Sequence, residues 1–236
     1  SQALQCIQNS MVYDGDQLST KASYKTDGAG WRSEGETHYV GRGAHKLLKA
    51  LEVFRVNVEG KIAADFGAST GGFTQVLLEQ NAKKIYAIDV GVDQLDSRLR
   101  DHPKVIDMPG TNVRYLESLP DELDLIVADL SFISLELVIP TMKKLLGALG
   151  EMIILVKPQF EVGKEGIDKN GIVQDRSLHF DILKKIRDFA HSHDVGLIAA
   201  TKSETIGKIG NQEYLYWFRN NSKSQVSDEV LRELCL

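Results

Sequence analysis

The sequence is poor in cysteine and contains no long apolar run, and each of these absences counts against a class of protein. Its two cysteines, Cys6 and Cys235, lie near opposite ends of 236 residues and form no recognisable metal or redox motif. A reducing cytoplasm is therefore the expected location. No apolar run approaches the roughly 20 residues that a membrane helix needs, and no signal peptide opens the chain.

The sequence also lacks an excess of positive charge. Its net charge of −5 gives no support by itself for nucleic-acid binding, although local basic patches rather than the total charge contact phosphates. No internal repeat or low-complexity segment is visible. Hydrophobic residues make up 42% and charged residues 26%, as in ordinary globular proteins, and the length suits one large domain with a small appendage.

Apolar runs and amphipathic stretches alternate from Tyr39 onward. Predicted helices cover Arg42–Phe54, Gly72–Glu79, Gln94–Arg100, Leu135–Leu146 and Ser177–His191. Predicted strands cover Ile62–Phe66, Lys84–Asp89, Lys104–Asp107, Leu123–Asp129, Met152–Lys157, Gly196–Thr201 and Glu213–Arg219. This alternation predicts an α/β fold with a doubly wound, Rossmann-like sheet that is mostly parallel. The short link before the last strand predicts that this strand pairs antiparallel.

Three regions follow from this pattern. Residues 1–37 are polar, with weak strand signals at Met11–Tyr13 and Lys21–Tyr24, and we interpret them as a partial module or arm. Residues 38–220 form the main α/β domain, and residues 221–236 are a C-terminal tail. The segment Pro158–Arg176 is long for a connection, and its position after a central strand favours a lid over a site.

The most informative stretch is Lys61–Asp89, which predicts a strand, a glycine turn, a helix and a second strand that ends in an acid. Such a unit binds a nucleoside-bearing ligand through bare backbone and holds its ribose hydroxyls with the second acid. Ser69 stands where a dinucleotide fingerprint has its second glycine, so a ligand without phosphates, such as S-adenosylmethionine, fits better. Asp65 could then hold the ligand's ammonium group, and Asp89 its ribose.

Two other interpretations of this turn stay open. Gly67, Gly71 and Gly72 could merely allow tight packing of strand and helix. The turn also matches the nucleophile elbow of α/β-hydrolases, with Ser69, Asp129 and either His191 or His193 in the required chain order. However, the elbow normally follows several strands, and these histidines end a helix. They also lie two residues apart, so they do not share a helix face, and we infer no metal site.

Two further strands end in polar residues. Asp129 ends the strand before the sequence ADLSFIS, and Lys157 ends the strand before Pro158. Taken alone, Asp129 could cap a helix and Lys157 could extend its amine to the surface. In a sheet of order 3-2-1-4-5, however, Gly67, Asp129 and Lys157 converge on one crevice. Leu130 and Ser131 replace the prolines that are usual in amine-methylating enzymes, which disfavours a base amine as acceptor.

Lys46 and Glu213 have weaker signals. Lys46 lies opposite the leucine stripe of its predicted helix, on the same side as Arg42 and Lys49, where a solvated face is the simpler interpretation. Glu213 begins the final strand and could equally be an exposed edge charge.

The segments GRGAHKLLKALEVF, DFGASTGGFTQ, AIDVGVDQL, TNVR, ADLSFISL, LVKPQFEVGKE and GNQEYLYW together resemble the TlyA (haemolysin A) family over about Tyr39 to Arg219. This family consists of FtsJ-like, S-adenosylmethionine-dependent ribosomal RNA 2′-O-methyltransferases. The resemblance implies a catalytic tetrad of Lys46, Asp129, Lys157 and Glu213. It implies a cofactor site at Asp65, Gly67, Ser69, Thr70, Gly71, Gly72, Phe73, Asp89, Asn112 and Asp129.

The resemblance has two departures. The family begins with a small RNA-binding module, and Ser1–Thr26 resembles only the second half of it. Pro109–Gly110 precede Thr111–Asn112 where the family usually has an acidic and a basic residue.

The expected reaction is in-line transfer of a methyl group to a ribose 2′-hydroxyl, which Lys157 deprotonates or polarises. The expected partner is ribosomal RNA or a ribosomal subunit, bound through Arg42, Lys49 and Lys164. Two alternatives stay open: a membrane-active haemolysin, as the family name suggests, and a cofactor-binding RNA or ribosome-interaction protein without catalysis.

Overall fold

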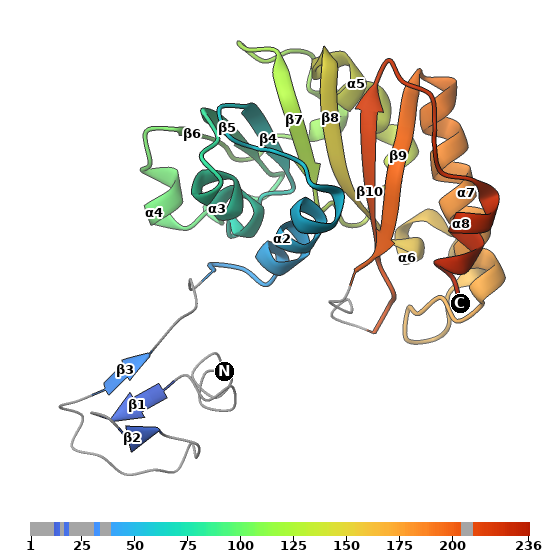
Figure 1. The fold of residues 1–236 in the computed structure, drawn as a ribbon, viewed down its shortest axis with the longest axis horizontal. Helices are drawn as coiled ribbons and strands as arrows, with labels where there is room; N and C mark the ends of the chain where they lie inside the picture. The colour runs from blue at the N-terminus through green and yellow to red at the C-terminus, as the bar shows by residue number, and fades with distance from the viewer. Residues whose placement is uncertain (1–11, 15–16, 19–30, 34–38, 204–209) are drawn as a thin grey trace. The chain divides into compact units, whose positions relative to one another are not determined.

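The computed structural model describes residues 12–14, 17–18, 31–33, 39–203 and 210–236. The chain divides into two units, Ser1–His38 and Tyr39–Leu236 (Figure 1). In the first unit, three short antiparallel strands are paired in the order β2-β1-β3: β1 (Val12–Asp14), β2 (Gln17–Leu18) and β3 (Trp31–Ser33). The predicted strand Met11–Tyr13 overlaps β1. The predicted strand Lys21–Tyr24 lies outside the described residues.

A seven-stranded sheet forms the centre of the second unit, in the order β6-β5-β4-β7-β8-β10-β9. Its strands are β4 (Ile62–Phe66), β5 (Lys84–Ile88), β6 (Val105–Met108), β7 (Leu123–Ala128), β8 (Leu146–Val156), β9 (Val195–Lys202) and β10 (Tyr214–Asn220). The first five pair in parallel, whereas β10 lies antiparallel between β8 and β9. The predicted doubly wound, mostly parallel sheet with an antiparallel last strand is confirmed.

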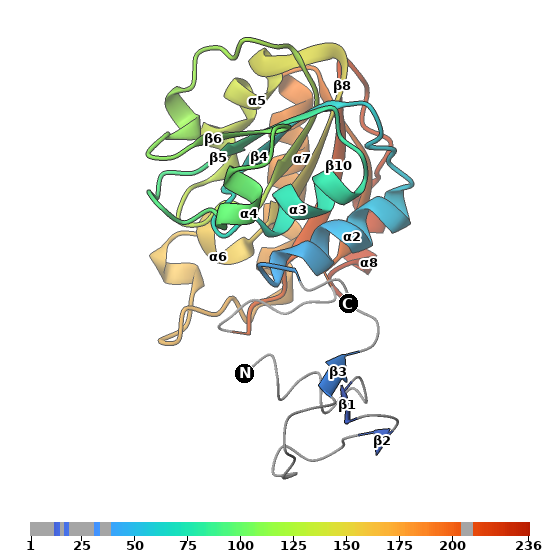
Figure 2. The same ribbon diagram turned by 90° about the vertical axis from the view of Figure 1, so that its left-hand side faces the viewer.

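Helices cover both faces of this sheet (Figure 2). The strands alternate between the two layers: on β7, Leu125 and Val127 face one core cluster, and Ile126 and Ala128 face the other. The first cluster includes side chains of α2 (Gly43–Phe54) and α3 (Gly72–Glu79), and a short helix, α4 (Ser97–Arg100), follows β5. The second cluster includes side chains of α5 (Ile139–Leu145), α7 (Arg176–Ser192) and α8 (Asp228–Glu233).

Several boundaries differ from the sequence-based expectation. The helix predicted over Leu135–Leu146 is divided into a 3-10 turn, η2 (Leu135–Leu137), and α5, because a proline occupies the first turn of α5. Strand β8 begins six residues before the predicted Met152. The predicted lid Pro158–Arg176 contains α6 (Pro158–Glu161) and a 3-10 turn, η3 (Lys164–Gly166).

Helix α8 has no counterpart in the sequence-based prediction, which treats residues 221–236 as a tail. Its Leu231 is fully buried in the core cluster that α7 also lines. The guanidinium of Arg187 on α7 fixes this helix by donating to the Val226 carbonyl at 3.2 Å and to Asp228 at 2.6 Å. The C-terminal residues therefore belong to the packed α/β unit.

Candidate active site

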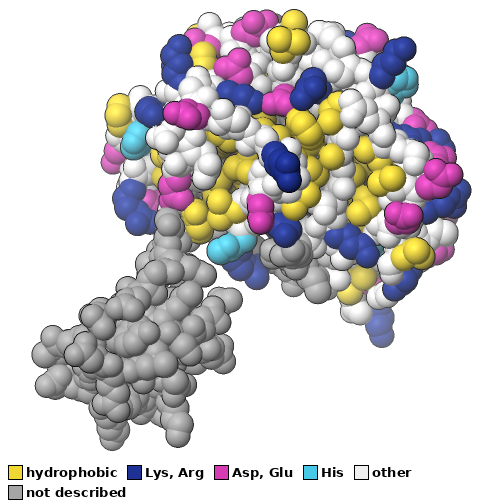
Figure 3. Space-filling view, viewed as in Figure 1, with side chains coloured by type: hydrophobic (Ala, Val, Ile, Leu, Met, Phe, Trp, Pro, Cys, Tyr) yellow, Lys and Arg dark blue, Asp and Glu magenta, His cyan; other side chains and the backbone are white. Residues whose placement is uncertain are grey.

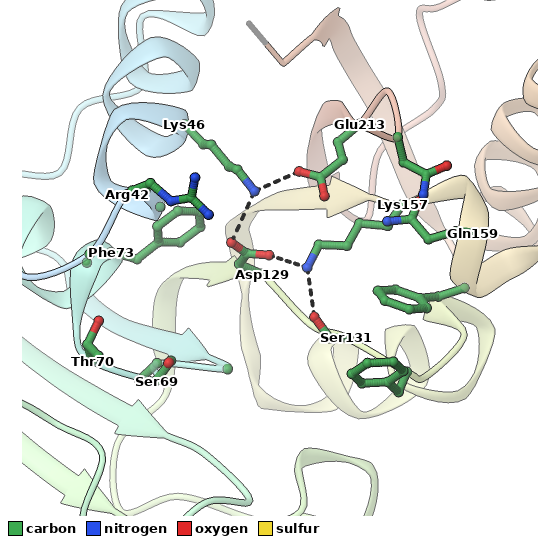
Figure 4. A pocket seen from close by; sticks show the side chains of 18 residues that line it. Arg42, Lys46, Ser69, Thr70, Phe73, Asp129, Ser131, Lys157, Gln159 and Glu213 are labelled. Atoms are coloured by element: carbon green, nitrogen blue, oxygen red, sulfur yellow. Dashed lines mark hydrogen bonds and ion pairs between the residues drawn. The ribbon is translucent and has the colours of Figure 1, made fainter. Parts of the chain in front are cut away.

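A cavity of about 530 Å³ lies at the carboxyl ends of β4, β7 and β8 (Figure 4). The first turn of α2 and the residues just before β10 complete its wall. Ten of the residues predicted for the site line it: Arg42, Lys46, Gly67, Ser69, Thr70, Gly72, Phe73, Asp129, Lys157 and Glu213. The strand order explains this convergence, because β4, β7 and β8 are neighbours in the sheet.

The four predicted catalytic residues form one chain of alternating charges. Glu213 accepts a hydrogen bond from Lys46 Nζ at 2.6 Å, and the same Nζ lies 3.6 Å from Asp129 Oδ2. Lys157 Nζ approaches the other oxygen of Asp129 at 2.5 Å and donates to Ser131 Oγ at 3.0 Å. Figure 4 shows the two lysines on either side of the Asp129 carboxylate.

This geometry rules out the simpler interpretations of these residues. The Lys46 side chain is 11% exposed and that of Lys157 is 9% exposed, so neither belongs to a solvated face or extends to the surface. Glu213 precedes an inner strand of the sheet and is buried, so it is not an edge charge. Asp129 caps no helix, because Ser134 holds that position before η2.

Lys46 enters the site because α2 packs closely on the glycine turn. A Cβ on Gly41 would lie 2.7 Å from Thr70 Oγ1, and one on Gly72 would lie 3.1 Å from the Gly41 carbonyl oxygen. Ala44 and Leu47 anchor the same helix in the core, which leaves Lys46 on the side that faces the cavity.

The glycine turn itself has left-handed backbone at Gly67 (φ +86°), Ser69 (φ +48°) and Gly71 (φ +99°). A Cβ on Gly67 would lie 2.9 Å from the Asp129 carbonyl oxygen, and one on Gly71 would lie 2.3 Å from Leu99 Cδ1. Gly67 and Gly71 therefore allow tight packing at these positions. A binding role stays compatible with this packing, since the same turn forms one wall of the cavity.

Asp65 and Asp89 lie next to this turn without lining the cavity. Asp65 is buried, and its Oδ2 accepts from Thr74 Oγ1 at 2.7 Å. Its Oδ1 has no hydrogen-bond partner among the described residues. Burial raises the pKa of this carboxyl to about 7. Asp89 accepts from the backbone amides of Ser69 at 2.8 Å and Gly91 at 2.7 Å, so it joins two turns at the end of β5.

The other predicted residues lie away from the cavity lining. Gly71 caps α3. Asn112 is exposed and caps a 3-10 turn, η1 (Val113–Tyr115), by accepting from the Arg114 amide at 3.0 Å. Lys49 forms a 3.8 Å ion pair with Glu52 on the same helix. Lys164 begins η3, and its side chain lies outside what the structure describes.

Further lining residues escaped the sequence analysis. They are Gly41, Gly43, Ala68, Ser131, Phe132, Gln159, Phe160 and Asn211. Ser131 and Phe132 follow Asp129 by two and three positions, as Gln159 and Phe160 follow Lys157. That shared spacing was the available signal. Phe132 is 90% exposed with φ +62°, and its ring lies 4.8 Å from that of Phe160.

The hydrolase interpretation is wrong. His191 and His193 precede β9, which runs parallel to β8, so they lie at the edge of the sheet opposite Asp129. His193 instead bonds the Phe189 carbonyl on its own helix at 2.9 Å. Within the described ranges, no three His, Cys, Asp or Glu side chains are grouped as a metal site would require. None of the helices described there is long and apolar enough to cross a membrane.

Comparison with known proteins identifies the family of this chain. The model of the FtsJ-like methyltransferase family matches residues 39–220. The 16S/23S rRNA (cytidine-2'-O)-methyltransferase TlyA of Mycobacterium tuberculosis is 41% identical over 206 residues, which cover 85% of this chain and 76% of that protein.

Solved structures agree with this assignment. A solved structure from Streptococcus thermophilus, with hemolysin in its description, superposes on this chain with a TM-score of 0.81. The two sequences are 36% identical, and the match covers 99% of this chain and 88% of that one. An S-adenosylmethionine-dependent methyltransferase from Mesorhizobium loti shares the fold at a TM-score of 0.52 and 14% identity, over 73% of this chain and 96% of that one. The chain therefore belongs to the FtsJ-like methyltransferase family and, within it, to the TlyA rRNA methyltransferases.

Proposed function

We propose that this chain transfers a methyl group from S-adenosylmethionine to a ribose 2′-hydroxyl of ribosomal RNA, in the cytoplasm. The observation that carries the proposal is the charged chain Glu213–Lys46–Asp129–Lys157, whose central Asp129 lies beside Gly67 of the glycine turn in one cavity. Four charged residues from four separate segments of the chain meet there.

The residues around the glycine turn suit the cofactor. The cavity of about 530 Å³ is within the range of about 300–1,000 Å³ usual for small-molecule sites. The N-terminal turn of α3, where Gly72 and Phe73 line the cavity, offers amides to a carboxylate beside the glycine turn. Each oxygen of Asp89 keeps a further lone pair for a ribose hydroxyl. The Asp65 carboxyl, whose Oδ1 has no hydrogen-bond partner among the described residues, lies behind the turn.

The chain's own residues then position and deprotonate the acceptor. S-Adenosylmethionine supplies an electrophilic methyl group and leaves as a neutral thioether. Once Lys157 has lost its own proton to solvent, its Nζ, held by Asp129 and Ser131, receives the hydroxyl proton as the bond between oxygen and methyl carbon forms and the bond from that carbon to sulfur breaks. Lys46 and Glu213 hold the other side of the Asp129 carboxylate and so fix its direction. Alignment of hydroxyl and methyl group supplies a large part of the rate.

Aromatic and basic side chains at the cavity suit a nucleotide of RNA. The exposed ring of Phe132, beside Phe160, offers a base a stacking surface. Arg42 lines the cavity and is exposed, so it is available to a phosphate. Figure 3 shows Lys and Arg side chains, interspersed with Asp and Glu, around apolar ones on one face of the molecule. Lys49 on α2 and Lys164 in η3 remain proposed contacts to RNA phosphates.

The test uses the purified full chain with labelled S-adenosylmethionine, intact ribosomal subunits and naked rRNA, with the methylated nucleotide mapped by mass spectrometry. The expected product is a 2′-O-methylated ribose. Lys157→Ala should lower kcat by about 100-fold or more, because it removes the proton acceptor, while cofactor affinity stays within twofold.

The matched control is Lys184→Ala, since this partly exposed lysine on α7 pairs with Asp188 away from the cavity. It should methylate as the unaltered chain does. Methylation of a base instead of a ribose would overturn the proposed acceptor. Full activity of Lys157→Ala would remove Lys157 from the mechanism, and cofactor binding without any transfer would favour an interaction protein.

A further inference from the structure

The carboxylate of Glu161 links the two loops that carry Asp129 and Lys157. Glu161 ends α6, four residues after Lys157, and its side chain reaches the loop that follows β7. Its Oε2 accepts from Ser134 Oγ at 2.7 Å, and its Oε1 accepts from the Leu135 backbone amide at 2.8 Å. Burial raises the pKa of this carboxyl, whereas the two hydrogen bonds lower it.

The same two loops meet at two other places. At the catalytic end, Lys157 contacts Asp129 at 2.5 Å and Ser131 at 3.0 Å. In the middle, the rings of Phe132 and Phe160 lie 4.8 Å apart. The contacts of Glu161 therefore close the far end of a continuous pairing between the two loops, away from the reacting groups.

The loop after β7 needs such a restraint. Phe132 has a left-handed backbone (φ +62°), which is a strained conformation for a residue other than glycine. Its ring is 90% exposed, so burial of the side chain does not hold it there. Polar contacts at Ser131 on one side and at Ser134 and Leu135 on the other side restrain the strained residue between them.

We propose that Glu161 is a positioning residue for methyl transfer: its hydrogen bonds to Ser134 and Leu135 keep Phe132 at the cavity mouth and Ser131 on Lys157. This role rests on the proposed function, since it concerns the RNA acceptor. Glu161 itself does not line the cavity. Loss of the Glu161 carboxylate therefore changes how RNA is held but leaves the glycine turn unchanged.

Glu161→Ala should lower kcat/KM for ribosomal RNA by about 10- to 100-fold, mostly through a higher KM, because a misplaced acceptor group can cost about that much. The dissociation constant of S-adenosylmethionine should stay within twofold. Glu161→Gln should restore most of the activity, since its carbonyl can accept from Leu135 and its amide can donate to Ser134. Glu165→Ala, an exposed acid on η3, is the matched control and should behave as the unaltered chain.

A milder variant keeps the test valid if Glu161→Ala folds poorly. Ser134→Ala removes one of the two contacts and should raise KM for RNA by about 3- to 10-fold, and combining it with Glu161→Ala should add little further loss. Unchanged kcat/KM in folded Glu161→Ala overturns the role. Parallel losses of thermal stability, cofactor affinity and activity would show a merely structural residue and overturn it too. If the unaltered chain methylates no ribose, the proposed function fails instead.

Discussion

At the scale of single residues, Asp65 has an unusual environment. It is buried on the side of β4 that faces α3, with one carboxylate oxygen on Thr74 and the other without a hydrogen-bond partner among the described residues. Burial raises its pKa to about 7. The folded chain therefore keeps this group protonated in a pH range where the unfolded chain, with an ordinary carboxyl, has lost the proton.

The stability of the folded chain therefore depends on pH, and the direction of the change follows from which state binds more protons. Between about pH 4 and pH 7 the folded state binds one more proton than the unfolded state, so the free energy of unfolding falls as pH rises and levels off above about 7. Between pH 5 and pH 8 we expect the free energy of unfolding to fall by about 3 kcal/mol more in the unaltered chain than in the Asp65→Asn variant. Urea titrations at the two pH values measure this difference. Equal losses in both proteins would contradict the raised pKa.

The residues of the site differ in how far the sequence could predict them. Asp129 and Lys157 were predictable because each ends an apolar strand, and parallel strands bring such ends to one crevice. The pairing of Lys46 with Glu213 depended on the family resemblance, since its partners are 167 positions apart. Glu161 carried no signal of its own, because its role arises from contacts between two loops.

At the scale of elements, the segment between α6 and α7 is fixed to the start of β10. The Asn211 side chain accepts from the Val173 amide at 3.0 Å and donates to the Gly171 carbonyl at 2.9 Å. His179 on α7 contacts the Val173 carbonyl at 2.9 Å and the Tyr214 hydroxyl at 2.8 Å. The segment predicted as a lid is thus anchored beside Glu213.

Removing this anchor should loosen the segment. In Asn211→Ala, the buried Val173 loses the partner of its amide, which costs about 1–3 kcal/mol locally. Amide exchange of a peptide spanning residues 168–175 should accelerate by about 10-fold or more, as hydrogen–deuterium exchange with mass spectrometry would measure. Asn170→Ala, an exposed residue of the same turn, is the control. Unchanged exchange in Asn211→Ala would show that other contacts hold the segment.

Element boundaries also show where sequence patterns are insufficient. The strand β4 and the helix α3 have the predicted bounds, because their apolar periodicity stops at glycines and polar residues. The early start of β8 was missed, since Gly147 and Gly150 interrupt its apolar run and its pairing with β7 and β10 determines its length. Helix α8 was missed because its burial depends on Arg187 and the α7 surface.

At the scale of the whole molecule, charge distribution matters more than net charge. The chain carries −5, yet Arg42 stands exposed at the cavity. We expect Arg42→Glu to weaken binding of an rRNA fragment and to lower the slope of log affinity against log salt by about 1, the value for one lost phosphate contact. Filter binding between 50 and 200 mM salt measures both quantities, with Lys184→Glu as the control. An unchanged slope would show that Arg42 contacts no phosphate.

The strand order has a consequence for when the enzyme can first act. Glu213 contacts Lys46 across 167 positions, and β10, which follows Glu213, inserts between β8 and β9. The catalytic chain of charges therefore cannot close until synthesis has passed Glu213 and β10 has left the exit tunnel. A chain synthesised only as far as α7 therefore lacks the assembled site.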